Sequence, residues 1–234
     1  MDDQSAVRFF HVWDTYARVV AGNYMFHREL GAAVRAILAA RFSQRLFAVL
    51  DLGCGDAATF APLLDGLAVG SYTGTDLSEA ALALARENLS HLACPVDLGC
   101  VDMMDALIKA PVHDAIYASF ALHHLETGAK EAFFRHVGAR LTPGGVFLLV
   151  DVCREEGETL PDYLNAYTAW VRIAMTGLSQ PEHDAICAHI IENDRPETAS
   201  TFDRFAEQAG LRRVGSATPH KWHRLLAFER LDAE

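Results

Sequence analysis

Short apolar runs alternate with segments of helical spacing through the middle of the chain. The apolar runs are too short for helices and end in glycine or polar turns, so each predicts a buried strand, while the segments between them predict helices. In order, the pattern predicts strand 47–52, a helix after Ala57, strand 72–75, helix 77–91, and strands 96–101, 114–119 and 146–151. Buried strands that alternate with helices are typical of an α/β fold, a parallel sheet covered on both faces.

The pattern changes on either side of this core. We expect a single domain, 1–234, made of an N-terminal helical arm (1–45), the core (46–152), a helical insertion (153–197) and a final helix with a terminal hairpin (198–234). The hairpin strands, 211–217 and 222–229, are separated by Thr218-Pro219-His220-Lys221 and therefore run antiparallel. The insertion follows the fifth strand of the core, at the sheet edge where ligands bind in open α/β folds. We expect the insertion and the arm to cover a substrate there.

The first predicted strand runs into a glycine turn, Gly53-Cys54-Gly55, and Ala58 completes a G-x-G-x-x-A spacing. The glycines allow a sharp turn and a close approach of the backbone to a nucleotide-like ligand. This spacing alone has low specificity. Asp51 and Asp56 flank the turn, however, and their carboxylates would repel a pyrophosphate. They suit a ligand that carries positive charge and no phosphate.

The second predicted strand ends at Asp76, which lies 21 residues after Gly55. An acid at about this spacing hydrogen-bonds the ribose hydroxyls of a bound adenosine. The alternative is a structural role at the start of a capped helix, because Ser78 and Glu79 follow. The spacing favours the ribose role.

The stretch 49–56 resembles motif I of the class I S-adenosylmethionine-dependent methyltransferases of small molecules, and the resemblance covers residues 47–152, including the turn 141–145, Leu-Thr-Pro-Gly-Gly. It implies a Rossmann-like, seven-stranded, mostly parallel sheet with a C-terminal antiparallel hairpin. It also implies S-adenosylmethionine as the cofactor, with Asp102 and Met103 at the adenine. The predicted cofactor-binding residues are Tyr16, Arg28, Asp51, Gly53, Cys54, Gly55, Asp76, Leu77, Asp102, Met103, Ser119 and Phe120.

The arm and the insertion supply candidates for substrate contact. On a helix, Tyr24, His27 and Arg28 share a face, and Tyr16 lies two turns earlier. In methyltransferases of this size such an arm often closes over the cofactor, so these side chains are expected at the methionine moiety or the substrate. The alternative is an amphipathic helix with a solvated polar edge. The insertion adds Tyr163, Tyr167 and Trp170, although aromatic residues at helical spacing are more often core.

His123 and His124 follow the fourth predicted strand, where the resemblance places the methyl group. Histidine titrates near neutral pH, so either imidazole is a candidate general base or orienting donor. The alternative is that one of them caps and packs the following helix. The Asn/Asp-Pro-Pro-aromatic phrase of methyltransferases that act on nucleobase amino groups does not follow this strand; Ser119 and Phe120 stand there instead. The acceptor is therefore expected to be a small molecule, methylated at oxygen, nitrogen or sulfur.

The 234 residues carry a net charge of −11, which argues against a protein that binds a nucleic-acid backbone. We also expect no membrane partner, since no apolar run has the length of a bilayer span, and a monomer or homodimer. The N-terminus lacks the basic start of a signal peptide, which predicts a cytoplasmic protein. The five cysteines form no C-x-x-C pair, and no metal is expected, because adjacent imidazoles on a strand or turn point apart.

Two rival functions share parts of this pattern. A nicotinamide-dependent oxidoreductase also has a glycine turn, but Asp51 and the terminal hairpin count against it. A regulatory protein that holds S-adenosylmethionine without transferring its methyl group would keep every cofactor motif. An open pocket between Tyr24, His123 and residues 163–170 would favour an enzyme, and a sealed one would favour a sensor.

Overall fold

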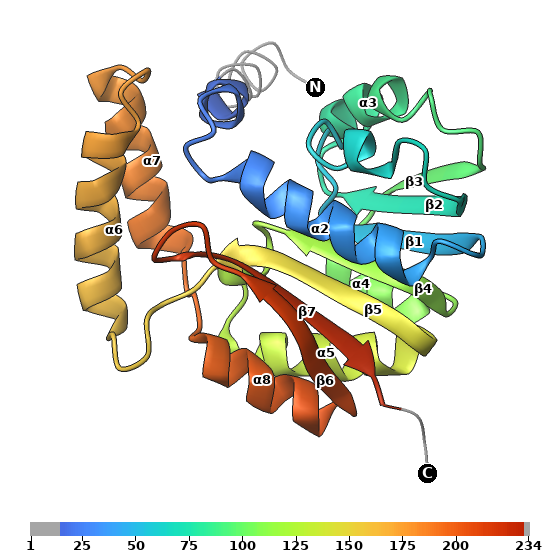
Figure 1. Cartoon of the computed structure of the whole chain (residues 1–234). Helices are drawn as coiled ribbons and strands as arrows, with labels where there is room; N and C mark the ends of the chain where they lie inside the picture. The colour runs from blue at the N-terminus through green and yellow to red at the C-terminus, as the bar shows by residue number, and fades with distance from the viewer. Residues whose placement is uncertain (1–14, 232–234) are drawn as a thin grey trace.

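The computed structural model describes residues 15–231, which contain one seven-stranded sheet. Its strands are β1 (Phe47–Leu52), β2 (Val69–Asp76), β3 (Val96–Cys100), β4 (His113–Ser119), β5 (Leu141–Val152), β6 (Leu211–Ala217) and β7 (His223–Arg230). The order is β3-β2-β1-β4-β5-β7-β6; the neighbours from β3 to β5 are parallel, and β7 is antiparallel to both β5 and β6 (Figure 1). The predicted Rossmann-like sheet with its antiparallel hairpin is confirmed.

Helices cover both faces of this sheet. They are α2 (His27–Arg41), α3 (Glu79–Asn88), α4 (Met103–Lys109), α5 (Thr127–Arg140), α6 (Leu160–Ala174), α7 (Gln180–Asn193) and α8 (Ala199–Gln208), with single 3₁₀ turns η1 (Ala61–Leu64) and η2 (Leu122–His124). α2, η1 and α3 pack on one face, and α4, α5 and α8 pack on the other. The α6–α7 pair stands beyond the carboxyl ends of the parallel strands (Figure 1).

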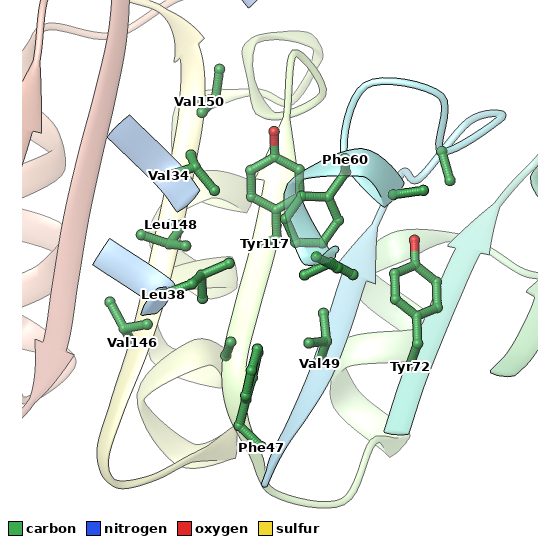
Figure 2. Close-up of a cluster of buried hydrophobic side chains, with 14 of the residues drawn as sticks. Val34, Leu38, Phe47, Val49, Phe60, Tyr72, Tyr117, Val146, Leu148 and Val150 are labelled. Atoms are coloured by element: carbon green, nitrogen blue, oxygen red, sulfur yellow. The ribbon is translucent and has the colours of Figure 1, made fainter. Parts of the chain in front are cut away.

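The central strands send alternate side chains into the two layers. Val49 packs under α2 with Val34 and Leu38, all three fully buried, while Leu50 faces α4 and α5. Each such side chain contributes about 1.5–3 kcal/mol through its burial. Figure 2 shows the α2 side, where Tyr72 and Tyr117 point their hydroxyls toward the same end of the sheet. This packing fixes the carboxyl ends of β1, β2 and β4 relative to one another.

Several boundaries differ from the sequence prediction. The helix expected after Ala57 is only the turn η1, which Gly66 follows with a φ of 71°. The helix expected from residue 77 begins at Glu79, because Ser78 Oγ accepts a hydrogen bond from Ala81 N and caps it. β5 begins at Leu141 rather than 146, since the Pro-Gly-Gly turn forms an irregularity within the strand instead of preceding it.

The predicted N-terminal arm is described only in part, since residues 1–14 lie outside the described range. Residues 15–21 are helical, and α2 follows after a break that contains Asn23 (φ 53°) and Phe26 (φ 59°). Within residues 15–231 no helix combines the length and the apolarity that crossing a bilayer demands. The single-domain organisation, the cytoplasmic location and the oligomeric state stay predictions.

Candidate active site

A cavity of about 240 Å³ opens at the carboxyl ends of β1 and β4. The chain leaves these neighbouring strands toward opposite sides of the sheet, which is where open α/β folds bind ligands. Its lining residues are Tyr16, Asp51, Gly53, Cys54, Gly55, Asp56, Thr59, Phe60, Tyr117, Ser119 and Phe120. Seven of the predicted cofactor-binding residues are among them: Tyr16, Asp51, Gly53, Cys54, Gly55, Ser119 and Phe120.

The glycine turn after β1 has the backbone that its sequence requires. Gly53 and Gly55 have φ values of 71° and 55°, in the left-handed region that favours glycine. Gly55 N donates to Asp76 Oδ2 across 2.9 Å, and Ser78 N donates to Asp76 Oδ1 across 2.8 Å. Asp76 therefore joins the turn to the start of α3. Its carboxylate has further lone pairs for ribose hydroxyls, so the structural and ribose roles are compatible.

Asp51, the residue before the last in β1, carries a buried carboxyl group, 2% exposed, on the cavity wall. Burial raises its pKa to about 7, with a smaller rise from the charge of Asp76 and an opposing effect of the hydrogen bond from Tyr72. Tyr72 Oη donates to Asp51 Oδ2 across 2.5 Å. Asp51 consequently changes charge near neutral pH, where a cationic ligand would draw it into the ionised form.

The carboxylates make the cavity electronegative. Burial raises the pKa of Tyr16 to about 12, and the charges of Asp56 and Asp76 add to the rise. Burial and the charge of Asp51 raise the pKa of the Cys54 thiol, which keeps the thiol protonated and unreactive at neutral pH. No lysine or arginine is among the eleven residues that line this cavity. The residues present therefore fit a ligand with ammonium and sulfonium charges and no phosphate, as S-adenosylmethionine is.

Besides Asp76, four predicted cofactor contacts are absent from the cavity lining. Arg28 is exposed on α2, and Leu77 is 72% exposed after β2. Asp102 Oδ1 accepts hydrogen bonds from Met104 N and Asp105 N at 2.8 and 3.3 Å, so its carboxylate caps α4. Met103 packs against the apolar layer beneath α4 and α5. Their roles at the cofactor stay predictions.

Phe120 connects the cavity with a second group of rings. Its φ of 49° is one that bulky side chains rarely adopt, and such backbone strain costs about 1–3 kcal/mol. The ring lines the cavity and meets the imidazole of His27 edge-on, with 5.0 Å between centroids; His223 follows at 6.3 Å. Strain of this kind is typical of functional positions.

Phe120 belongs to a group of stacked and edge-on rings that we call the ring cluster. Its members are Phe26, His27, Phe120, Tyr167, Trp170, His220 and His223. Among the described residues, His27 Nε2, His220 Nδ1 and His223 Nδ1 are buried without a hydrogen-bond partner. Burial lowers the pKa of His27 to about 4 and that of His223 to about 3, so both imidazoles are neutral at pH 7. The cluster thus offers unprotonated nitrogen atoms next to an apolar wall.

The predicted substrate residues of the insertion are mostly buried. Tyr163 and Tyr167 are 0% and 3% exposed, and their rings stack with 5.1 Å between centroids. This agrees with the alternative that they are core aromatics, and substrate contact by Tyr163 would require that core to open. Trp170 stacks on Tyr167 at 5.5 Å and belongs to the ring cluster. Tyr24 Oη accepts a hydrogen bond from Gly177 N across 2.7 Å and ties the arm to the insertion.

His123 and His124 do not diverge as expected; their ring centroids lie 4.0 Å apart within the 3₁₀ turn η2. His123 Nδ1 donates to Asp151 Oδ1 across 2.5 Å, and His123 N donates to Asp151 Oδ2 across 3.0 Å. Burial lowers the pKa of His123, but the charge and hydrogen bond of Asp151 outweigh it, so that pKa is raised. Burial and the neighbouring His123 lower the pKa of His124 to about 4. Neither lines the cavity, and their catalytic role stays a prediction.

Sequence reasoning did not single out several residues that the fold brings to the site: Tyr72, Tyr117, Thr59, Phe60, His220 and His223. Tyr72 had a signal, since a tyrosine inside a buried strand needs a partner for its hydroxyl. His220 and His223 belong to the terminal hairpin, and its folding back brings them to Phe26 and Phe120. Phe60 stacks on Tyr117 with 4.0 Å between centroids, a contact that nothing local in the sequence indicates (Figure 2).

The sheet order, the glycine turn and the acid after β2 define a class I methyltransferase fold. Residues 49–145 match the model of a methyltransferase domain family. The predicted resemblance to the methyltransferases is thereby confirmed over these residues. Magnesium protoporphyrin IX methyltransferase of Synechocystis PCC 6803, solved with SAH bound, shares the fold at a TM-score of 0.65 and 18% identity, covering 98% of this chain and 100% of that one.

Curated relatives match parts of the chain. A carboxy-S-adenosyl-L-methionine synthase of Campylobacter fetus is 28% identical over 147 residues, which cover 62% of this chain and 58% of the synthase. The highly reducing polyketide synthase PKS2 of Leptosphaeria maculans is 29% identical over 124 residues, 48% of this chain but 5% of that protein. The chain therefore spans little more than half of the first relative and a small part of the second.

Proposed function

We propose that this protein transfers the methyl group of S-adenosylmethionine to an oxygen, nitrogen or sulfur atom of a small-molecule acceptor. The observation that carries the proposal is the position of Phe120. Its ring lies between the acidic cavity of the glycine turn and the unpartnered Nε2 of His27. A donor site on one side and a proton acceptor on the other suit a displacement at a methyl carbon.

In this proposal the chain binds the donor through its acids. Asp76 accepts hydrogen bonds from the ribose hydroxyls while it holds the glycine turn through Gly55 N. Asp51 and Tyr16 both line the cavity, where Asp51 would pair with the ammonium group and Tyr16 would cover the methionine end. Bound S-adenosylmethionine supplies a methyl carbon that its sulfonium has already activated. The protein's task is to align the acceptor and to exclude water.

The ring cluster is the proposed acceptor site, and His27 is its proposed base. A hydroxyl or amine that reaches His27 Nε2 donates its proton to a neutral imidazole, since the low pKa of His27 keeps the ring unprotonated at pH 7. Phe26 and Trp170 offer flat apolar surfaces to an aromatic or cationic acceptor. In the described conformation His27 Nε2 is buried, so an acceptor reaches it only after the surrounding side chains move.

Similarity to carboxy-S-adenosyl-L-methionine synthases raises a second possible chemistry, formation of a carboxylated donor. A carboxylate at the methyl position calls for a nearby cation. The residues that line the cavity in the described part of the chain include Asp51 and Asp56 but no lysine or arginine. This charge favours methyl transfer.

Calorimetric titration of the full chain with S-adenosylmethionine and S-adenosylhomocysteine, with NAD as control, tests the donor. We expect both adenosyl ligands to bind with dissociation constants in the micromolar range and NAD not to bind. Small acceptors are then screened by mass spectrometry for the gain of one methylene group, and the donor is examined for the gain of one carboxyl group. Donor binding with no product from any acceptor class would favour the regulatory alternative, and binding of NAD alone would overturn the proposal.

A further inference from the structure

Two histidines and one carboxylate converge at the carboxyl edge of the sheet, outside the cavity. One ligand atom each from His123, His124 and Asp194 lies within 4.8 Å of the others, the one such group of three among residues 15–231. Asp194 Oδ1 is 3.7 Å from His123 Nε2 and 3.7 Å from His124 Nδ1. The histidines come from η2, and Asp194 directly follows α7.

Asp194 Oδ1 has a buried position and no hydrogen-bond partner among the described residues. The residue is 3% exposed, so water does not compensate for the missing donor. The two neighbouring cations are used elsewhere. Lys130 Nζ donates to the carbonyls of Leu125 and Arg195, both across 2.5 Å, and the Arg195 guanidinium donates to the carbonyls of Asp194 and Glu192. The carboxylate oxygen therefore faces two imidazole nitrogens, each 3.7 Å away.

Asp151 fixes the orientation of His123. Because the Nδ1–H of His123 donates to Asp151, the ring is oriented with its other nitrogen, Nε2, toward Asp194. A carboxylate that holds one imidazole nitrogen while the other binds a metal is a recurrent arrangement in metal sites. A hydrogen bond does not replace the ion here, since 3.7 Å from either imidazole nitrogen to Asp194 Oδ1 exceeds hydrogen-bonding distance.

We propose that His123, His124 and Asp194 bind one divalent transition-metal ion, with Asp151 as a positioning residue. Two imidazoles and one carboxylate suit ions such as Zn²⁺. Ligands at about 2.0–2.1 Å around a tetrahedral ion lie roughly 3.3 Å from one another, so the observed spacing closes with small side-chain shifts. The His124 side chain is 39% exposed, which leaves the outer side of the site accessible to a water ligand.

The ion would connect two parts of the chain that already touch. Arg195 N donates to His123 O across 2.7 Å, which brings the segment after α7 against η2. In Figure 1 the end of α7 reaches the carboxyl edge of the sheet at this point. A metal ion there would hold the α6–α7 insertion on the core.

The test is titration of the chelator-treated full chain with Zn²⁺, followed by calorimetry and by competition with a chromophoric chelator. We expect one ion per chain. His124→Ala and Asp194→Asn should each raise the dissociation constant about tenfold or more, since each removes a ligand. His91→Ala and Asp65→Asn are matched controls, because His91 Nε2 and Asp65 Oδ1 form a 2.8 Å surface pair without a second imidazole. Both controls should bind Zn²⁺ as the unmodified chain does.

Thermal unfolding gives an independent readout. Zn²⁺ should raise the Tm of the unmodified chain and of the controls by more than that of Asp194→Asn at the same Zn²⁺ concentration, because an ion bound only to the folded state stabilises it in proportion to its occupancy. The exposed side chain of His124 makes His124→Ala a variant that folds even if the buried substitution does not. Absence of Zn²⁺ binding, or equal affinity in His124→Ala and the unmodified chain, would overturn the proposal.

Discussion

Tyr72 and Asp51 form a buried hydrogen bond between neighbouring strands, Oη to Oδ2 across 2.5 Å. Tyr72 lies on β2 and Asp51 at the end of β1, and they are 0% and 2% exposed. The Tyr72 hydroxyl donates a hydrogen bond to the Asp51 carboxyl group inside the sheet. Burial nevertheless raises the pKa of Asp51 to about 7. The cavity wall thus contains an acid that titrates in the physiological range.

This raised pKa predicts a pH-dependent stability. The unfolded chain ionises Asp51 near pH 3.8 and the folded chain near pH 7, so the fold loses stability as pH rises through this window. Relative to Asp51→Asn, the ligand-free protein should lose up to about 4 kcal/mol of unfolding free energy between pH 4 and pH 8. Urea denaturation of both proteins across that range measures the difference. Parallel pH profiles would show that Asp51 ionises normally.

Donor binding should release protons at neutral pH. A cationic ligand beside Asp51 lowers the pKa of its carboxyl group, so the fraction still protonated at pH 7 is lost on binding. Calorimetry of S-adenosylmethionine in two buffers of different ionisation enthalpy reports this proton release. Asp51→Asn should bind with the same apparent enthalpy in both buffers. An equal buffer dependence in that variant would place the titrating group elsewhere.

Asp76→Ala should weaken donor binding at least about tenfold, because hydrogen bonds to a charged carboxylate contribute about 1.5–3 kcal/mol. The variant also frees Gly55 N, so the glycine turn loses its link to α3. Asp97→Ala, at an exposed position of β3, is the matched control and should leave the affinity unchanged. Calorimetric titration of the unmodified chain and both variants with S-adenosylmethionine measures the affinities. Unaltered affinity in Asp76→Ala would contradict the proposed contact between Asp76 and the ribose.

His27→Phe should reduce turnover by roughly 10²–10⁴-fold, the usual contribution of a general base, with little change in donor affinity. Phenylalanine keeps the edge-on packing against Phe120 and removes only the nitrogen atoms. The readouts are single-turnover rates at saturating acceptor and the dissociation constant of S-adenosylhomocysteine. His136→Ala, on α5, is the control. If His27→Phe kept full activity and His124→Ala lost it, the general base would be one of His123 and His124 instead of His27.

Substitution of two glycines of α5 by alanine should change the stability of the fold in opposite directions. A Cβ at Gly138 would lie 2.2 Å from Ala209 O, backbone that ends α8, so Gly138→Ala should destabilise the fold by about 1–3 kcal/mol or more. A Cβ at Gly128 meets nothing within 4 Å, and alanine there should stabilise by up to about 1 kcal/mol. Chemical denaturation measures both. Equal effects would contradict the close approach of α5 and α8.

The local sequence pattern was sufficient to predict the sheet and the glycine turn. A buried strand and a left-handed turn are both encoded by adjacent residues, such as Val49 to Gly55. The pattern was insufficient for η1, where Gly66 stops a helix that the preceding residues favour. The site shows the same limit. The approach of Asp194 to His123, and of His223 to Phe120, depends on how the insertion and the hairpin fold back, which no spacing within either segment indicates.

The hydrogen bond from Gly177 N to Tyr24 Oη fastens the segment before α2 to the loop between α6 and α7, above the ring cluster. In the proposed reaction an acceptor that enters between these two segments needs this hydrogen bond released, and its methylated product leaves by the same route. Each catalytic cycle therefore contains an opening and a closing step. The frequency of opening sets the ceiling on turnover, however fast the methyl group moves.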